Sequence, residues 1–129
     1  MMEIKLTEVN SEAVKIAKKL RGGEILALSG PLGSGKTSFT KALAKELGIS
    51  RTVTSPTFVL MQQYKGKNFW LYHLDLYRTK NFAEVSALGL EEVWGRKETI
   101  TVIEWAEKIQ AHLPSNTIHI NFTRDINAN

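Results

Sequence analysis

Outside the middle of the chain, the pattern of hydrophobic and polar positions predicts four short strands. In residues 2–7 (MEIKLT), apolar side chains alternate with charged ones, which is typical of a half-buried strand. Residues 24–29 (EILALS) and 99–105 (TITVIEW) are nearly continuous apolar runs, as expected for strands buried on both faces of a sheet. Residues 116–122 (NTIHINF) alternate again and predict a last strand.

Two helices are predicted in the first half of the chain. The first follows Asn10 or Ser11, either of which can act as its N-cap, and ends at the glycine pair 22–23. Its apolar stripe has helical spacing and consists of Ala13, Ile16, Ala17 and Leu20. The second helix covers residues 37–47 (TSFTKALAKEL), and Gly48 stands where a helix-ending glycine is expected.

The middle of the chain predicts a hairpin rather than another helical crossover. The second half of residues 49–64 indicates a strand, residues 65–68 (KGKN) a turn, and residues 69–77 (FWLYHLDLY) the returning strand. A hairpin makes the sheet mixed, because its two strands are antiparallel. Residues 81–95 indicate a broken helix, and residues 106–113 a short one.

Composition favours one globular domain over residues 1–129 and a cytoplasmic location. The chain is 43% hydrophobic, has no cysteine and has no apolar run near the ~20 residues of a membrane span. The net charge of +4 could reflect an RNA-facing surface. However, the basic residues are scattered along the sequence, and the largest local group is Lys18, Lys19 and Arg21, which favours a solvated helix face.

A glycine-rich loop connects the strand at 24–29 to the helix at 37–47. Residues 30–37 (GPLGSGKT) match the P-loop pattern G-x-x-x-x-G-K-[ST]. Glycines let backbone N–H groups turn towards phosphate oxygens, and the helix N-terminus adds donors and a positive dipole. Lys36 is expected to reach the β- and γ-phosphates, and the Thr37 hydroxyl to bind Mg²⁺. The predicted fold is therefore an α/β, P-loop NTPase-like three-layer domain with a mixed, mostly parallel sheet.

Catalysis by a P-loop domain needs further polar groups, and three residues are candidates. Glu104 ends the apolar strand at 99–105, where a carboxylate can hold Mg²⁺ or orient the attacking water. Asp75 lies near another strand end, where a solvated carboxylate is equally expected. Thr57, in the polar stretch TVTSPTF, could sense the γ-phosphate, although a strand-starting threonine is the simpler interpretation. A lone histidine such as His73 is usually structural.

The chain lacks a motif that commonly selects guanine as the base of the nucleotide. Guanine specificity commonly comes from an N-K-x-D loop late in the domain, and no late segment of this chain matches it. ATP, or a loosely specified nucleotide, is therefore favoured. Two alternatives to an ATPase remain open: a binding module whose shape ATP controls, and a small-molecule kinase. The kinase is less favoured because the segment between Arg78 and Arg96, where a basic lid would lie, is acidic.

Five segments of the chain form a recognisable set: GPLGSGKTSFTKALAKELGI, VTSPTFVLMQQY, YHLDLYR, LGLEE and IEWAEKI. Together they resemble the bacterial TsaE family, the small ATPase of tRNA threonylcarbamoyladenosine (t6A) biosynthesis. They occur in the family's order and spacing, from about residue 4 to residue 122. A P-loop alone is generic, whereas SPTF, H-x-D-L-Y-R and I-E-W in combination are specific.

The resemblance implies roles for individual residues. ATP would be held by Gly30, Gly33, Ser34, Gly35, Lys36, Thr37 and Ser38, and Mg²⁺ by Thr37 and Glu104. The catalytic set would be Lys36, Asp75, Glu104 and Thr57, with Thr57 in the switch-like SPTF segment as a neighbour of the γ-phosphate or Mg²⁺. His73 and Arg78 fall in the family's H-x-D-L-Y-R motif, and Trp105 would pack beside the site. Glu107 and the helix start near Asn10 and Ser11 would approach the nucleotide, and Arg124 is the only late basic residue able to replace a more C-terminal contact.

The resemblance also implies partners. Family members associate with the threonylcarbamoyl transferase subunit and its inactive paralogue, and their ATPase activity is low without that complex. ATP hydrolysis would reset the transferase between rounds of modification at position 37 of tRNA. This chain would then contact tRNA indirectly, through the complex, and would have no membrane partner.

Overall fold

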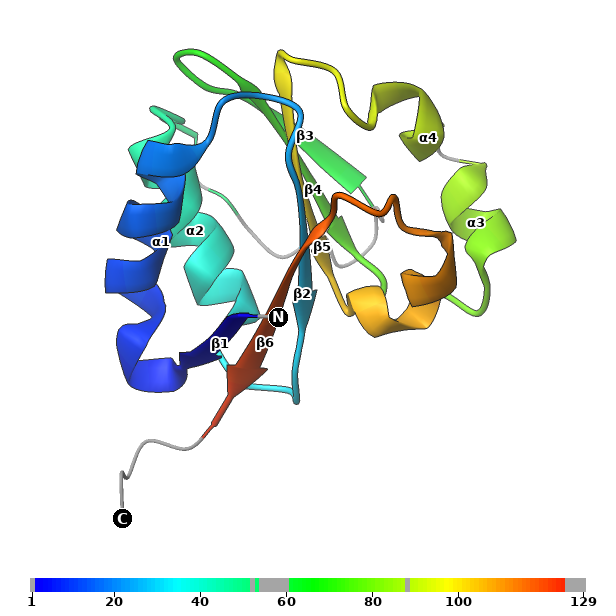
Figure 1. The fold of residues 1–129 in the computed structure, drawn as a ribbon, viewed down its shortest axis with the longest axis horizontal. Helices are drawn as coiled ribbons and strands as arrows, with labels where there is room; N and C mark the ends of the chain where they lie inside the picture. The colour runs from blue at the N-terminus through cyan, green and yellow to red at the C-terminus, as the bar shows by residue number, and fades with distance from the viewer. Residues whose placement is uncertain (1, 52, 54–60, 88, 125–129) are drawn as a thin grey trace.

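A six-stranded sheet forms the centre of the molecule, with helices on both of its faces (Figure 1). The computed structural model describes residues 2–51, 53, 61–87 and 89–124. The strands are β1 (Met2–Lys5), β2 (Ile25–Ser29), β3 (Met61–Lys65), β4 (Trp70–Asp75), β5 (Thr99–Glu104) and β6 (Ile118–Thr123). The α-helices are α1 (Val9–Lys19), α2 (Lys36–Glu46), α3 (Phe82–Ser86) and α4 (Leu90–Val93), and the 3-10 helices are η1 (Leu6–Glu8) and η2 (Ala106–His112).

The sheet order is β1-β6-β2-β5-β4-β3. All neighbouring strands are parallel except β3 and β4, which form the antiparallel hairpin expected from the sequence. Figure 1 shows α1 and α2 on one face of the sheet and α3, α4 and η2 on the other. The predicted three-layer α/β fold with a mixed, mostly parallel sheet is confirmed.

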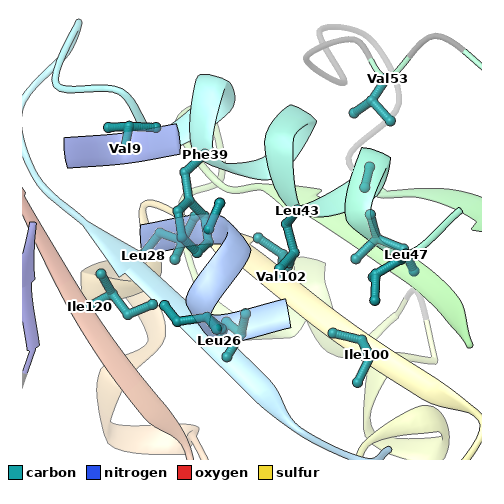
Figure 2. Close-up of a cluster of buried hydrophobic side chains, with 14 of the residues drawn as sticks. Val9, Leu26, Leu28, Phe39, Leu43, Leu47, Val53, Ile100, Val102 and Ile120 are labelled. Atoms are coloured by element: carbon teal, nitrogen blue, oxygen red, sulfur yellow. The ribbon is translucent and has the colours of Figure 1, made fainter. Parts of the chain in front are cut away.

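Alternation along β2 divides its side chains between two cores. Leu26 and Leu28 pack under α1 and α2, whereas Ile25 and Ala27 pack on the opposite face, beneath η2 and α3. Both faces of β2 are therefore dry, which explains its nearly continuous apolar sequence. Figure 2 shows the first core, in which side chains of α2 lie over β2 and β5. This packing fixes the start of α2 beside the carboxyl ends of the central strands.

Two details of the predicted elements are wrong. Helix α1 begins at Val9 with Glu8 as its N-cap, rather than after Asn10 or Ser11. The reason is local, because the Glu8 carboxylate accepts the Lys5 N–H at 2.9 Å and closes the 3-10 turn η1 ahead of the helix. The second difference is that η2 is a 3-10 helix interrupted at Ile109, not a short α-helix over 106–113.

Two further expectations are confirmed within the described residues. The stripe of α1 faces the core, with Ala13 and Ile16 buried. Two short helices, α3 and α4, occupy the segment 81–95 that was predicted as a broken helix. None of the helices in the described part of the chain is long and apolar enough to cross a membrane.

Replacing Phe39 with alanine should destabilise the fold by about 3–5 kcal/mol. Phe39 is fully buried on α2 and packs edge-on against Phe122, with ring centroids 5.4 Å apart. Its removal would leave a cavity between α2 and β6. Chemical denaturation should show this loss, whereas Leu32→Ala, at a side chain that is 67% exposed, should change stability by less than about 0.5 kcal/mol. Equal effects of the two substitutions would contradict this account of the core.

Candidate nucleotide site

The loop between β2 and α2 has a backbone that only glycine can adopt easily. Gly30, Gly33 and Gly35 all have positive φ, of 143°, 76° and 104°. A Cβ atom on Gly30 would lie 2.5 Å from the Phe122 carbonyl oxygen, and one on Gly35 would lie 2.8 Å from a methyl carbon of Val9. Close packing against β6 and α1 therefore requires glycine at both positions and holds the loop at the N-terminus of α2.

A pocket of about 280 Å³ opens over this loop. It is lined by Leu6, Leu32, Gly33, Ser34, Gly35, Lys36, Thr37, Ser38, Asp75, Tyr77, Glu104 and Trp105. The loop and α2 provide one wall, and the carboxyl ends of β4 and β5 provide the other. The Ser34 hydroxyl oxygen is buried and has no hydrogen-bond partner among the described residues. A buried hydroxyl of this kind requires a polar partner, so the pocket suits a polar ligand.

Lys36, the first residue of α2, is folded back onto the loop. Its Nζ donates hydrogen bonds to the carbonyl oxygens of Gly30, at 2.5 Å, and Pro31, at 3.0 Å. It also lies 4.0 Å from the centroid of the Trp105 ring, in cation–π geometry. Only 5% of Lys36 is exposed. The ammonium group is thus held at the pocket wall by the loop and by an aromatic face.

Thr37 and Glu104 meet across the pocket. The Thr37 hydroxyl donates to the Glu104 carboxylate, with distances of 3.0 Å to Oε1 and 3.2 Å to Oε2. Glu104 is 2% exposed, and its Oε2 is also 2.5 Å from Nε2 of His73 on β4. The carboxylate at the end of β5 is therefore fixed from both sides, by a hydroxyl on α2 and by a buried imidazole.

Asp75 and Trp105 complete the wall formed by the strand ends. Asp75 Oδ1 accepts the Tyr77 N–H at 3.0 Å, which turns the chain at the end of β4. Trp105 has a φ of 60° and is the only non-glycine residue with positive φ among the described residues. This uncommon backbone places the indole over Lys36 and against the Tyr77 ring, whose centroid is 5.0 Å away.

Burial lowers the pKa of Lys36 below the ordinary lysine value of 10.5. The main cause is desolvation of its ammonium group, and the negative charges of Glu104, Glu107 and Asp75 oppose the shift. Lys36 is thus a partly desolvated cation whose ammonium form is favoured by three nearby carboxylates.

Comparison with known proteins identifies the family. The family model described as threonylcarbamoyl adenosine biosynthesis protein TsaE matches residues 5–129. The chain belongs to the TsaE family. The tRNA threonylcarbamoyladenosine biosynthesis protein TsaE of Bacillus subtilis is 39% identical, over 96% of this chain and 80% of its own length. The TsaE protein of Rickettsia bellii is 41% identical, over 88% of this chain and 78% of its own.

A solved TsaE-like structure supports the fold. The crystal structure of YdiB from Bacillus subtilis superposes with a TM-score of 0.76 at 32% identity, covering 96% of this chain and 75% of the other. The resemblance to TsaE expected from the sequence motifs is thus confirmed. The roles of individual residues in this TsaE chain rest on the geometry above.

Most of the predicted site residues of this TsaE chain gather in one pocket. Gly33, Ser34, Gly35, Lys36, Thr37, Ser38, Asp75, Glu104 and Trp105 all line it, and Gly30 accepts a hydrogen bond from Lys36. Glu107 lies close enough to act on the charge of Lys36. Thr57, with Ser55, Pro56 and Phe58, lies outside the described residues.

Other predicted neighbours lie apart from the pocket or at its rim. Asn10 lines a different hollow, on the outer side of α2, and the Ser11 hydroxyl donates to the Glu8 carbonyl oxygen. Leu6 is the residue from this region that lines the pocket. Arg78 is exposed and is not part of the lining. Arg124 lies beside the loop, since a Cβ atom on Gly33 would be 3.9 Å from its Nε.

His73 contacts a predicted site residue, Glu104, whereas its sequence position alone indicated a structural role. It is fully buried and contacts Glu104, while its Nδ1 has no hydrogen-bond partner among the described residues. One sequence feature could have indicated this contact: His73 and Asp75 are two positions apart on one strand and so share a face. Asp75 is paired with Glu104 in the sheet register, which puts all three side chains on the same side.

Proposed function

We propose that this TsaE chain is an Mg²⁺-dependent ATPase that binds the threonylcarbamoyl transferase complex. Hydrolysis would reset that complex between rounds of t6A formation at position 37 of tRNA. The observation that carries the proposal is the contact between Thr37, at the start of α2, and Glu104, at the end of β5, beside Lys36. The TsaE family acts in t6A biosynthesis, which supports the pathway.

The residues present fit a triphosphate. The unpartnered, buried Ser34 hydroxyl, the glycine backbone of the loop and the start of α2 converge on one pocket. Lys36 would exchange its hydrogen bonds to the Gly30 and Pro31 carbonyl oxygens for phosphate oxygens. Trp105 would keep the ammonium at the wall during this exchange, because the cation–π contact does not use its N–H donors.

The residues also fit a magnesium ion. A threonine hydroxyl and a carboxylate are hard oxygen donors of the kind that Mg²⁺ prefers, and the ion usually takes its remaining ligands from phosphates and water. When bound, Mg²⁺ would neutralise charge that develops on the phosphates. His73 would hold the Glu104 carboxylate in place, and Asp75, paired with Glu104 at the neighbouring strand end, would orient the attacking water.

Low activity in the absence of partners would follow from the position of Lys36. Its Nζ is occupied by two loop carbonyl groups, so productive contact with phosphate requires a rearrangement of donors. A partner that stabilises the rearranged loop would raise turnover by shifting this equilibrium. The proposed partners are the threonylcarbamoyl transferase subunit and its inactive paralogue, in the cytoplasm, where tRNA is modified.

The test is ATP hydrolysis with Mg²⁺, measured first with the purified chain and then with the transferase pair and tRNA. We expect a low rate that rises when the pair is added. A mixture without the pair but with tRNA is the control for non-specific stimulation. A rate that does not respond to the pair would contradict the assembly-dependent mechanism, and absence of ATP binding would contradict the site itself.

A further inference from the structure

The basic residues of this chain are concentrated in residues 13–67, and most of the acidic residues lie before or after that segment. Residues 13–67 contain ten of the 17 Lys and Arg residues but only two of the 13 Asp and Glu residues. This segment contains the part of α1 from residue 13 on, β2, the glycine loop, α2 and the hairpin strand β3. The rest of the chain has more acidic than basic residues. More than half of the basic residues therefore belong to one part of the fold.

The fold collects five of these cations on one side of the sheet. Helices α1 and α2 lie together on that side (Figure 1). The β3–β4 turn joins them at the end of α2, where the Lys67 N–H donates to the Leu47 carbonyl oxygen at 2.8 Å. We call the resulting surface the basic face; its cations, all exposed, are Lys18, Lys41, Lys45, Arg51 and Lys67.

Three adjoining hollows follow the basic face. One, of about 220 Å³, is lined by Lys41, Lys45 and Arg51 among others, and a second, of about 460 Å³, by Lys41 and Lys45. The third, of about 350 Å³, contains Lys18, Lys45 and Lys67. Lys45 borders all three. The surface thus offers successive concave sites, each with at least two cations.

These cations are not neutralised by the protein. Among the described residues, the ion pairs are Lys15 with Glu12 and His73 with Glu104, so none of the five takes part in one. Glu46 is the only acidic residue that lines the hollows, and it borders two of them. Attraction to helix C-termini explains a lysine at the end of α1 or α2, but not Lys41 in the middle of α2 or Lys67 on the turn.

We propose that the basic face binds the sugar–phosphate backbone of RNA directly. A backbone carries one negative charge per nucleotide and can enter consecutive hollows, whereas a flat lipid surface cannot. None of the exposed large apolar side chains of the described residues lines these hollows, so the face has no side chain for insertion into a membrane. Binding would be driven largely by release of counterions from the phosphates.

This inference goes beyond the proposed ATPase function and changes one expectation. The contact with tRNA would be direct, in addition to the route through the transferase complex. The hollow of about 460 Å³ reaches Ser38, which also lines the nucleotide pocket. RNA on the basic face would therefore lie next to the start of α2 without occupying the pocket.

The test compares two double variants of equal charge. Lys45→Ala with Lys67→Ala removes two cations of the basic face. Lys80→Ala with Arg96→Ala removes two exposed cations that lie outside residues 13–67. Fluorescence anisotropy with a labelled, unmodified tRNA transcript would be recorded between about 50 and 200 mM salt. Binding by the Lys45/Lys67 variant should be weaker by about tenfold at low salt, and its slope of log affinity against log salt smaller by about two.

Several results would overturn the proposal. Equal tRNA affinity of the two variants would do so, as would absence of tRNA binding by the unaltered protein at low salt. Binding to phosphatidylserine vesicles without binding to tRNA would indicate a membrane surface instead. Loss of stimulation by the transferase pair with unchanged tRNA affinity would indicate a protein interface. ATP hydrolysis without RNA should be equal in both variants, which separates this test from that of the ATPase.

Discussion

Replacing Glu104 with glutamine should reduce ATP hydrolysis by about 100-fold or more while nucleotide binding is largely retained. The substitution keeps the size of the side chain and its contact distance to Thr37 but removes the negative charge that would hold Mg²⁺. Binding would persist because the loop backbone, Ser34 and Lys36 lie on α2 and the segment before it. Turnover of ATP, with and without the transferase pair, and the affinity for a labelled nucleotide are the two measurements.

Glu107→Gln is the matched control for Glu104→Gln. Glu107 is exposed and also acts on the charge of Lys36, but it has no hydrogen bond to Thr37 or His73. Its substitution should change turnover by much less. Unchanged turnover in Glu104→Gln would remove this carboxylate from the mechanism. If Glu104→Gln instead lost turnover but still gave full stimulation of t6A formation, hydrolysis would not be needed and the chain would be a nucleotide-controlled binding module.

The sheet and its helices were predictable because their patterns are local. The neighbouring strands β2 and β5 have nearly continuous apolar runs, and the loop glycines Gly30, Gly33 and Gly35 lie within six residues of sequence. The N-cap of α1 was not predictable by the usual preference for Asn or Ser, because the Glu8 carboxylate bonds the Lys5 N–H and starts the helix earlier. Likewise, the left-handed backbone at Trp105 interrupts the chain before η2, and no sequence pattern indicated it.

The sequence predicted which residues form the candidate site, but not which of their side chains contact one another. The loop residues follow from one motif, and Glu104 follows from its place at a strand end. The contact of His73 with Glu104 joins residues 31 positions apart and depends on the register of β4 against β5. The position of Lys36 over Trp105 depends on the side-chain packing between α2 and the end of β5. The first contact follows from the sheet register and the second from helix packing, and neither is a local pattern in the sequence.

The second large effect is expected for Lys36. Lys36→Ala should weaken ATP binding by roughly 10- to 100-fold, because a hydrogen bond to a charged group contributes about 1.5–3 kcal/mol. Turnover should fall as well, since the same ammonium group would stabilise charge on the transferred phosphoryl group. Lys41→Ala, on the same helix but outside the nucleotide pocket, is the control and should retain ATP affinity. Equal losses in both variants would show a general effect of charge instead.

The lowered pKa of Lys36 gives this prediction a dependence on pH. Only the ammonium form would bind phosphate strongly. As the pH is raised, ATP affinity should therefore begin to fall before pH 10.5, the ordinary pKa of lysine, is reached. Bound phosphates would raise the pKa of Lys36, so ATP binding in this range should take up protons. Calorimetry in two buffers of different ionisation enthalpy would measure that uptake, which should be absent in Lys36→Ala.

The stability of the protein without nucleotide should depend on pH in the opposite direction. Between the lowered pKa of Lys36 and 10.5, the unfolded chain binds more protons at this residue than the folded chain does. The free energy of unfolding should therefore rise with pH in this window relative to that of Lys36→Met, which has no group to titrate. Below the lowered pKa, the cost of burying the ammonium is fully present. A constant difference between the two proteins across this window would show that Lys36 titrates as an exposed lysine does, and that the folded pocket does not desolvate it.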